Sequence, residues 1–143
     1  MMAAITLEQA NIIIEKSIEI RHQLGLAPLT VAVLDAGGHL VAFKREDKSS
    51  LLRPQIAQGK AWGTLGMGIS SRKIVDRFGA NTPFFTSLSM LCEGQMLASP
   101  GGLLIRDKDD QIIGAVGISG DTGENDEKCA IAGIEAAGLR YDP

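Results

Sequence analysis

Aromatic side chains are scarce in this chain, and their scarcity excludes one broad class of function. Phe, Trp and Tyr together make up only 4% of the residues, and the formal net charge at pH 7 is −3. A protein that binds nucleic acid needs a basic surface to neutralise phosphates, often with aromatic rings that stack on bases. We therefore expect no nucleic-acid partner.

Cysteines and long apolar runs are also few. The two cysteines, Cys92 and Cys129, fit neither a CxxC metal site nor a disulfide framework. No apolar run approaches the ~18 residues that a membrane-spanning helix needs. The first residues lack the basic region and apolar core of a signal peptide. These features predict no membrane segment and a cytoplasmic location.

The chain does contain enough apolar sequence for one core. Hydrophobic residues make up 45% of its 143 residues and charged residues 22%, which is ordinary for a soluble globular domain. Residues 1–143 are therefore predicted to form a single domain. The 17 glycines exceed the usual share of about 7%, which indicates close packing between backbone segments.

The centre of the predicted fold is a β-hairpin between Leu29 and Asp47. Residues 31–34 are apolar on both faces of a strand, which is typical of a central strand covered by helices on both sides. Residues 35–38, Asp-Ala-Gly-Gly, supply the small residues that a tight turn requires. An apolar return strand follows and ends in four charged residues, 44–47.

The rest of the pattern predicts helices and three further strands. Thr6 and Gln9 form a capping box that opens a helix to about Leu24. Three of the four phenylalanines fall between residues 78 and 85, where core packing explains them best, although they could also form the wall of a site for a planar ligand. The other expected helices are 53–67, 70–78, 82–91 and 125–138, and the other expected strands are 95–98, 103–106 and 112–119. This order predicts an α+β domain with a five-stranded antiparallel sheet and helices on both faces.

Lys60 is the anomaly of the second predicted helix, because it lies on the apolar face of that helix. Ala57, Ala61 and Thr64 share the face with it. A buried ammonium needs a partner or a lowered pKa. One interpretation is a structural ion pair with a nearby carboxylate. The other is a lysine that binds an anion or handles a proton in a pocket.

The chain has only two histidines. His22 falls at the margin of the apolar arc of the first helix, where it is either a packed boundary residue or a ligand at the edge of a groove. His39 lies beside the Gly-Gly turn and is expected to be exposed to solvent. His22 is therefore the better candidate for a ligand.

Several short motifs follow one another in a fixed order along the chain. They are Asp35, Gly37, Gly38 and Leu40 in the hairpin, Arg45 and Asp47 after it, Lys60 and Ala61 on the helix, and Gly114 to Gly120 in the last apolar strand. Together with the turn at 99–103, these motifs resemble the GlcG/HbpS family, also called DUF336, which includes the C-terminal domain of PduO-type proteins. The resemblance covers residues 6 to 137, and one departure is that the turn lacks the family's extra glycine and following proline.

The resemblance implies a fold and a range of functions. The implied fold is a profilin-like α/β/α sandwich, and the implied assembly is a homo-oligomer. Some family members bind haem or a corrinoid. We therefore expect a haem- or tetrapyrrole-binding protein that acts in haem sequestration or degradation, with His22 as axial ligand to the iron. The remaining cofactor-binding candidates are Arg45, Arg53, Lys60, Pro100, Gly101 and Gly102.

Two other hypotheses stay open. The chain could be a cofactor-independent enzyme of the tautomerase or hydratase kind that acts on a small organic acid. Lys60, Arg45 and Arg53 would then hold a carboxylate. Lys60, Asp35 and Asp47 are the catalytic candidates, and Glu46 could replace one of the aspartates in proton transfer. The chain could also be a non-catalytic structural partner.

Small residues on two helices bear on assembly. Glycines and alanines recur along the helices at 53–67 and 125–138, and they permit close helix approach within the fold or between subunits. We predict a dimer or a higher even-numbered assembly. Its ligand pocket would lie near a subunit interface, lined by the Lys60 helix, by Arg45 and Asp47, and by the turn at 100–102.

Overall fold

The core of the fold is a five-stranded antiparallel sheet, as predicted. The computed structural model describes residues 4–143. The strands are β1 (Thr30–Asp35), β2 (Leu40–Arg45), β3 (Gly102–Arg106), β4 (Ile112–Ser119) and β5 (Arg140–Tyr141). They are arranged in the order β2-β1-β4-β3-β5, and every neighbouring pair is antiparallel. The apolar strand β1 is therefore an inner strand, as its two apolar faces indicated.

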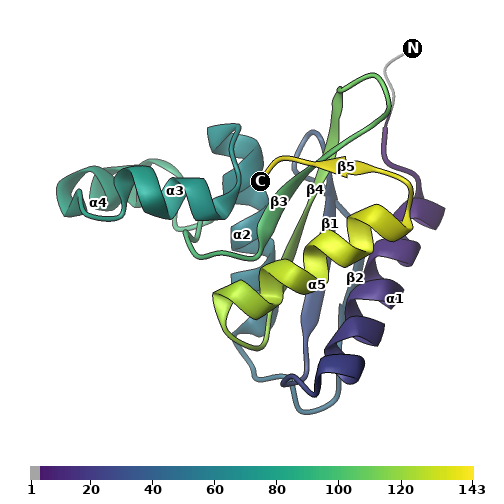
Figure 1. Cartoon of the computed structure of the whole chain (residues 1–143). Coiled ribbons are helices and arrows are strands. Elements are labelled where there is room, and N and C mark those ends of the chain that lie inside the picture. The colour runs from purple at the N-terminus through teal and green to yellow at the C-terminus, as the bar shows by residue number, and fades with distance from the viewer. Residues whose placement is uncertain (1–3) are drawn as a thin grey trace.

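Helices cover both faces of this sheet. They are α1 (Leu7–Leu24), α2 (Arg53–Met67), α3 (Ser71–Phe78), α4 (Thr82–Leu91) and α5 (Gly123–Ala136). In Figure 1, α1 and α5 lie side by side on one face and α2 lies on the opposite face. The larger apolar cluster lies between the sheet and the α1/α5 layer, and a smaller one lies under α2. Among residues 4–143, no helix combines the length and apolar character needed to cross a bilayer.

The helix ends follow the local signals in the sequence. Thr6 Oγ1 accepts a hydrogen bond from the Gln9 amide, and the Gln9 side chain accepts one from the Thr6 amide, both at 3.0 Å. Gly25 adopts φ 65° and ends α1. Thr122 caps α5, so this helix begins at Gly123, two residues before the predicted start. The capping box therefore fixes the first helix as predicted.

One predicted strand is wrong. Residues 95–98 form no strand, and the Leu97 amide donates a hydrogen bond to the Gly59 carbonyl oxygen in α2 at 3.2 Å. A Cβ at Gly59 would lie 3.1 Å from Leu97 Cβ, so the glycine permits this close approach. The fifth strand is the two-residue β5, which pairs with β3 and is too short to show an alternating pattern.

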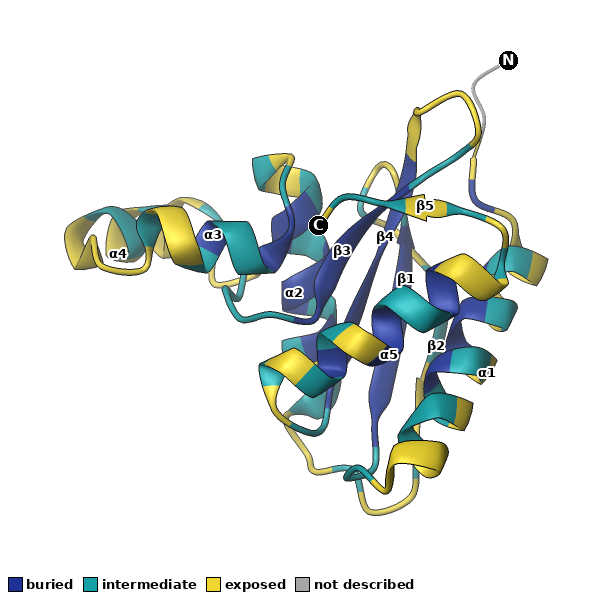
Figure 2. Cartoon of the chain, viewed as in Figure 1, coloured by how far each residue is buried: buried dark blue, intermediate teal, exposed yellow. Residues whose placement is uncertain are grey.

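Helix α3 is attached to the sandwich through the buried residues Ser71 and Ile74, whereas α4 leaves it. The predicted core role of Phe78, Phe84 and Phe85 is wrong, because all three are only half-buried. Figure 1 shows both helices projecting away from the sheet. No residue of α4 is buried, and Figure 2 shows α4 in the colours of exposed and half-buried residues. The rings pack on one another instead, with centroids 4.9 Å apart for Phe78 and Phe84 and 6.2 Å apart for Phe84 and Phe85.

Helix α2 lies in direct contact with β4 because the strand has a glycine at the crossing. A Cβ at Gly117 would overlap the Ala57 carbonyl oxygen and would lie 2.8 Å from the Ala61 nitrogen. These are backbone atoms of α2, which cannot move away as a flexible side chain can. Gly117 therefore sets the distance between the helix and the sheet.

Two glycine substitutions should have opposite effects on stability. Gly117→Ala should lower the free energy of unfolding by about 3 kcal/mol, because α2 must shift to admit the methyl group. Gly66→Ala, on the same helix, should raise it by about 0.5–1 kcal/mol, because no atom lies within 4 Å of its Cβ position and alanine favours the helix. Urea denaturation of both variants measures the two effects. A Gly117→Ala protein as stable as the parent would contradict the packing described here.

Candidate functional site

Lys60 forms a buried ion pair with Asp126. Its ammonium nitrogen lies 3.1 Å from Asp126 Oδ2 and 2.8 Å from the Ile118 carbonyl oxygen. The two side chains are only 3% and 1% exposed. The other carboxylate oxygen of Asp126 accepts a hydrogen bond from the Asp121 amide at 2.9 Å. Both charged groups are therefore satisfied by partners within the chain.

Burial and mutual attraction act in opposite directions on this pair. Burial lowers the pKa of Lys60, and the nearby Asp126 charge opposes that shift. Burial likewise raises the pKa of Asp126, and the Lys60 charge opposes it. The charge-assisted hydrogen bond between the two groups also opposes both pKa shifts, although burial is the larger cause for each. The arrangement favours the structural interpretation of Lys60 over an anion-binding or proton-handling role.

The predicted turn at 100–102 packs against this pair. Gly101 and Gly102 are buried, and a Cβ at Gly101 would lie 3.0 Å from Lys60 Nζ. Pro100 packs against Gly123 at the start of α5, 3.1 Å from its Cβ position. These residues and Lys60 form a packed junction between α2, β4 and α5.

The two predicted arginines lie at the same end of the sheet as this junction. Arg53 Nη1 donates to Ser119 Oγ at 3.0 Å. Arg45 pairs with Thr30 in the sheet, and Thr30 pairs with Ser119. Arg45 is exposed, however, whereas the Lys60 ammonium is enclosed beside Asp126. The three cations therefore share one end of the sheet, but Lys60 is already engaged.

Three predicted site residues meet in a hollow where the C-terminal half of α1 faces the end of β2. His22, Arg45 and Asp47 all line this hollow, which has a volume of about 510 Å³. We call it the His22 hollow. Its complete lining is Ile18, Arg21, His22, Lys44, Arg45, Glu46 and Asp47.

Glu46 organises the His22 hollow. Its Oε2 accepts hydrogen bonds from the Leu29 amide at 2.6 Å and from Arg21 Nε at 3.0 Å. Its Oε1 lies 3.2 Å from His22 Nε2, while His22 Nδ1 lies 3.3 Å from Arg21 Nη1. The His22 side chain is 59% exposed. A half-buried carboxylate thus orients an exposed imidazole, an arrangement typical of histidines that bind metals.

Asp35 lies away from the His22 hollow, at the opposite end of the β1–β2 hairpin. Its Oδ1 accepts hydrogen bonds from the amides of Gly37 and His39, and it lies 3.2 Å from His39 Nδ1. The backbone hydrogen bond from His39 is the main cause that lowers the pKa of Asp35. A general base gains from a raised pKa, so Asp35 fits the role of stabilising the turn. His39 is exposed, as expected.

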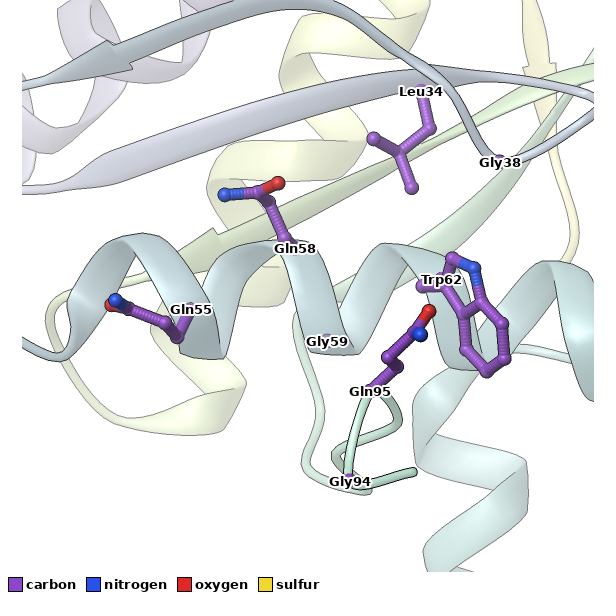
Figure 3. A pocket seen from close by; sticks show the side chains of 8 residues that line it. All are labelled: Leu34, Gly38, Gln55, Gln58, Gly59, Trp62, Gly94 and Gln95. Atoms are coloured by element: carbon purple, nitrogen blue, oxygen red, sulfur yellow. The ribbon is translucent and has the colours of Figure 1, made fainter. Parts of the chain in front are cut away.

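A second hollow contains residues that sequence reasoning missed. It lies along α2 and has a volume of about 430 Å³ (Figure 3). Its complete lining is Leu34, Gly38, Gln55, Gln58, Gly59, Trp62, Gly94 and Gln95, and we call it the α2 groove. Four of these residues lie at positions i, i+3, i+4 and i+7 of α2 and therefore on one face of that helix. They are Gln55, Gln58, Gly59 and Trp62. That spacing was visible in the sequence, whereas the contribution of Gln95 was not.

The fold defines the chain as an α+β domain of the α/β/α sandwich class. The family model described as "Haem degrading protein HbpS-like" matches residues 5–135, so the chain belongs to this family. No curated protein matches the chain.

Three solved structures share the fold. The haem complex of PduOC is 24% identical, with 99% of this chain and 100% of that chain covered and a TM-score of 0.86. The Klebsiella pneumoniae protein ORFY is 22% identical, with 96% and 94% covered and a TM-score of 0.86. A double mutant of HbpS from Streptomyces reticuli is 21% identical, with 94% and 88% covered and a TM-score of 0.79. At these identities the likeness supports the fold alone.

Removing Lys60 from the buried ion pair should lower the free energy of unfolding, and neutralising Asp126 as well should restore most of it. Lys60→Met should lower the free energy of unfolding by about 3–5 kcal/mol, because it leaves the Asp126 carboxylate buried without a cation. Lys60→Met/Asp126→Asn should regain most of that loss. Urea denaturation at pH 7 measures both variants. If the double variant were no more stable than the single one, the buried charge would not be the cause.

Proposed function

We propose that this protein binds haem or a related tetrapyrrole in the His22 hollow. The observation that carries the proposal is the exposed imidazole of His22, oriented by Glu46 in a hollow whose lining has three cations and two carboxylates. Membership in the HbpS-like family supports it, as does the shared fold with a haem complex of PduOC.

The donor set in the hollow fits a tetrapyrrole that carries its own metal. Within residues 4–143, no three His, Cys, Asp or Glu side chains gather as they would around a metal ion. A metal held by His22 would therefore bring its other ligands with it, as the iron of haem does. Nε2 of His22 faces the Glu46 carboxylate and Nδ1 lies 3.3 Å from Arg21 Nη1, so His22 would hold the iron only after one of these two partners moves away. Arg21, Lys44 and Arg45 would hold the propionate groups.

The His22 hollow provides little apolar surface for a macrocycle. Ile18 is the one apolar side chain in its lining, and the other lining side chains are charged or imidazole. A tetrapyrrole has two apolar faces, and covering the second face needs atoms from outside this hollow. We infer that a second subunit supplies them, which connects the ligand to assembly.

Both sequestration and degradation are compatible with such a site. An iron bound at an imidazole that is 59% exposed stays accessible to small oxidants and reductants from solvent. The family description supports degradation. Incubating the haem-loaded protein with ascorbate in air distinguishes the roles, because degradation bleaches the Soret band and sequestration preserves it.

Titration with hemin tests the proposed function. The protein should give a red-shifted Soret band, and His22→Ala should weaken binding by about tenfold or more, because the axial ligand is lost. His39→Ala is the matched control, since it removes the other exposed histidine outside the hollow, and it should bind as the parent does. A parent protein that leaves the Soret band unchanged would end this proposal.

The proposed homo-oligomer rests on α4 rather than on the small residues of α2 and α5. The buried ones among those small residues serve internal packing: Gly63 faces Met96, and Gly133 faces the Ile13 carbonyl oxygen and Ser17. In α4, by contrast, Met90 and Leu91 are 75% and 81% exposed. Residues 78–92 carry no charge, so two copies can meet there without like-charge repulsion. A second copy that covers α4 would bury this apolar surface.

Charges placed on α4 should dissociate the assembly. The parent should have a mass of twice 15.1 kDa or a higher even multiple, and Met90→Lys/Leu91→Lys should shift it to a monomer, because burying two ammonium groups is unfavourable. Leu24→Lys, at another exposed leucine, should leave the mass unchanged. Light scattering at micromolar concentration measures all three. A parent mass near 15.1 kDa would contradict the proposal.

A further inference from the structure

The α2 groove is built from three separate parts of the chain. One face of α2 supplies Gln55, Gln58 and Trp62. The β1–β2 hairpin supplies Leu34 and Gly38, and the loop after α4 supplies Gly94 and Gln95. In Figure 3, Leu34, Gln58, Gln95 and Trp62 surround the stretch of α2 at Gly59.

Two close approaches hold these parts together. The Leu97 amide bonds to the Gly59 carbonyl oxygen at 3.2 Å, which fixes the nearby Gln95 beside α2. On the other side, a Cβ at Gly38 would lie 3.3 Å from Nε1 of Trp62, so the hairpin turn packs against the indole ring. The walls of the groove are thus positioned by backbone contacts at glycines, and the groove is preformed.

The chemistry of the lining is neutral and rich in amides. The groove contains three glutamine side chains and no charged residue. In the described part of the chain, the side chains of Gln55 and Gln95 make no hydrogen bond, and that of Gln58 makes one long contact of 3.4 Å to the Pro54 carbonyl oxygen. A primary amide carries two donors and an acceptor. These groups are therefore free to bond a ligand.

Trp62 gives the groove a flat, half-buried wall. It packs against a small apolar cluster formed by Leu34, Ala61 and Ala115. A smaller hollow of about 200 Å³ adjoins it, lined by the turn at 36–38 together with Trp62, Leu65 and Gly66. The indole thus separates two hollows, and a planar ligand in the α2 groove can stack against it.

We propose that the α2 groove is a second small-molecule site, which takes an uncharged planar heterocycle with a lactam or imide edge. The ligand is uncharged because no lining residue would compensate a charge. It is planar because the indole offers a stacking surface. Its edge is a lactam or imide because adjacent donor and acceptor atoms there match those of a glutamine amide. The volume of about 430 Å³ suits a ligand of this size.

This site is separate from the His22 hollow. The two hollows share no lining residue, and they lie on opposite faces of the sheet, one at α1 and the other at α2. The inference therefore stands independently of the proposed tetrapyrrole site. A substitution can therefore abolish binding in the α2 groove and leave binding in the His22 hollow intact, or the reverse.

Riboflavin is a suitable probe, because its tricyclic ring is planar and uncharged and ends in an imide. Trp62 is the only tryptophan of the chain, so its fluorescence reports binding in the groove directly. Riboflavin should quench this fluorescence in a saturable way. Gln58→Leu and Gln95→Leu should each weaken binding about fivefold, because each removes hydrogen bonds of ordinary strength. Gln111→Leu, at an exposed glutamine outside the groove, should bind as the parent does.

Variants at Trp62 lack the fluorescence that reports binding, so for these variants the bound riboflavin is measured instead. Retention of riboflavin in equilibrium dialysis should persist in Trp62→Phe, which keeps a ring, and should be lost in Trp62→Leu. No saturable quenching in the parent, or parent-like binding by both glutamine variants, would overturn the proposal. Glucose should not quench Trp62; equal quenching by glucose, weakened by the same substitutions, would assign the groove to polyols instead.

Hemin separates this site from the proposed function. Gln58→Leu/Gln95→Leu should give the same Soret shift as the parent, and His22→Ala should bind riboflavin unchanged. If the glutamine substitutions abolished the Soret shift, the groove would be part of the tetrapyrrole site and the inference of a second site would be wrong.

Discussion

The buried Lys60–Asp126 pair connects elements that are remote in the sequence. Lys60 belongs to α2, its carbonyl partner Ile118 to β4, and Asp126 to α5. Asp126 also accepts the Asp121 amide, and Asp121 in turn accepts the amide of Ala27, which precedes β1. One ion pair and its hydrogen bonds therefore fix the end of the sheet at which the helices on both faces meet. Replacing only one charge leaves the other buried, so the junction depends on both.

The same helix has a structural face and an open face. Lys60, Ala57 and Ala61 face the sheet, where Gly117 allows contact without intervening side chains. The face with Gln55, Gln58 and Trp62 points away and lines the α2 groove. Because the inner face is held by backbone contacts and a buried ion pair, the outer face is rigidly placed. A groove on such a helix needs little ordering when a ligand binds.

Sequence reasoning succeeded where the signal was local and failed where it depended on distant contacts. The capping box at Thr6 and the doubly apolar strand β1 are local patterns, and both are confirmed. Burial of Lys60 followed from its helical face, but its partner Asp126 lies 66 residues away and could not be identified. The strand expected at 95–98 failed because its backbone bonds to α2 rather than to a strand.

The His22 hollow and helix α4, the two surfaces proposed to contact a second copy, each lack something that a second copy would supply. The His22 hollow has cations and an imidazole but only Ile18 as apolar lining, so it cannot by itself cover a macrocycle. Helix α4 has apolar side chains but no layer of its own chain over them, since none of its residues is buried. In a monomer, one apolar face of the proposed ligand would stay in water, and the apolar side chains of α4 would stay in water as well. Both exposures are unfavourable. If a second copy covered the His22 hollow as proposed, it would remove the open face of the ligand from water, and ligand binding and assembly would then stabilise each other.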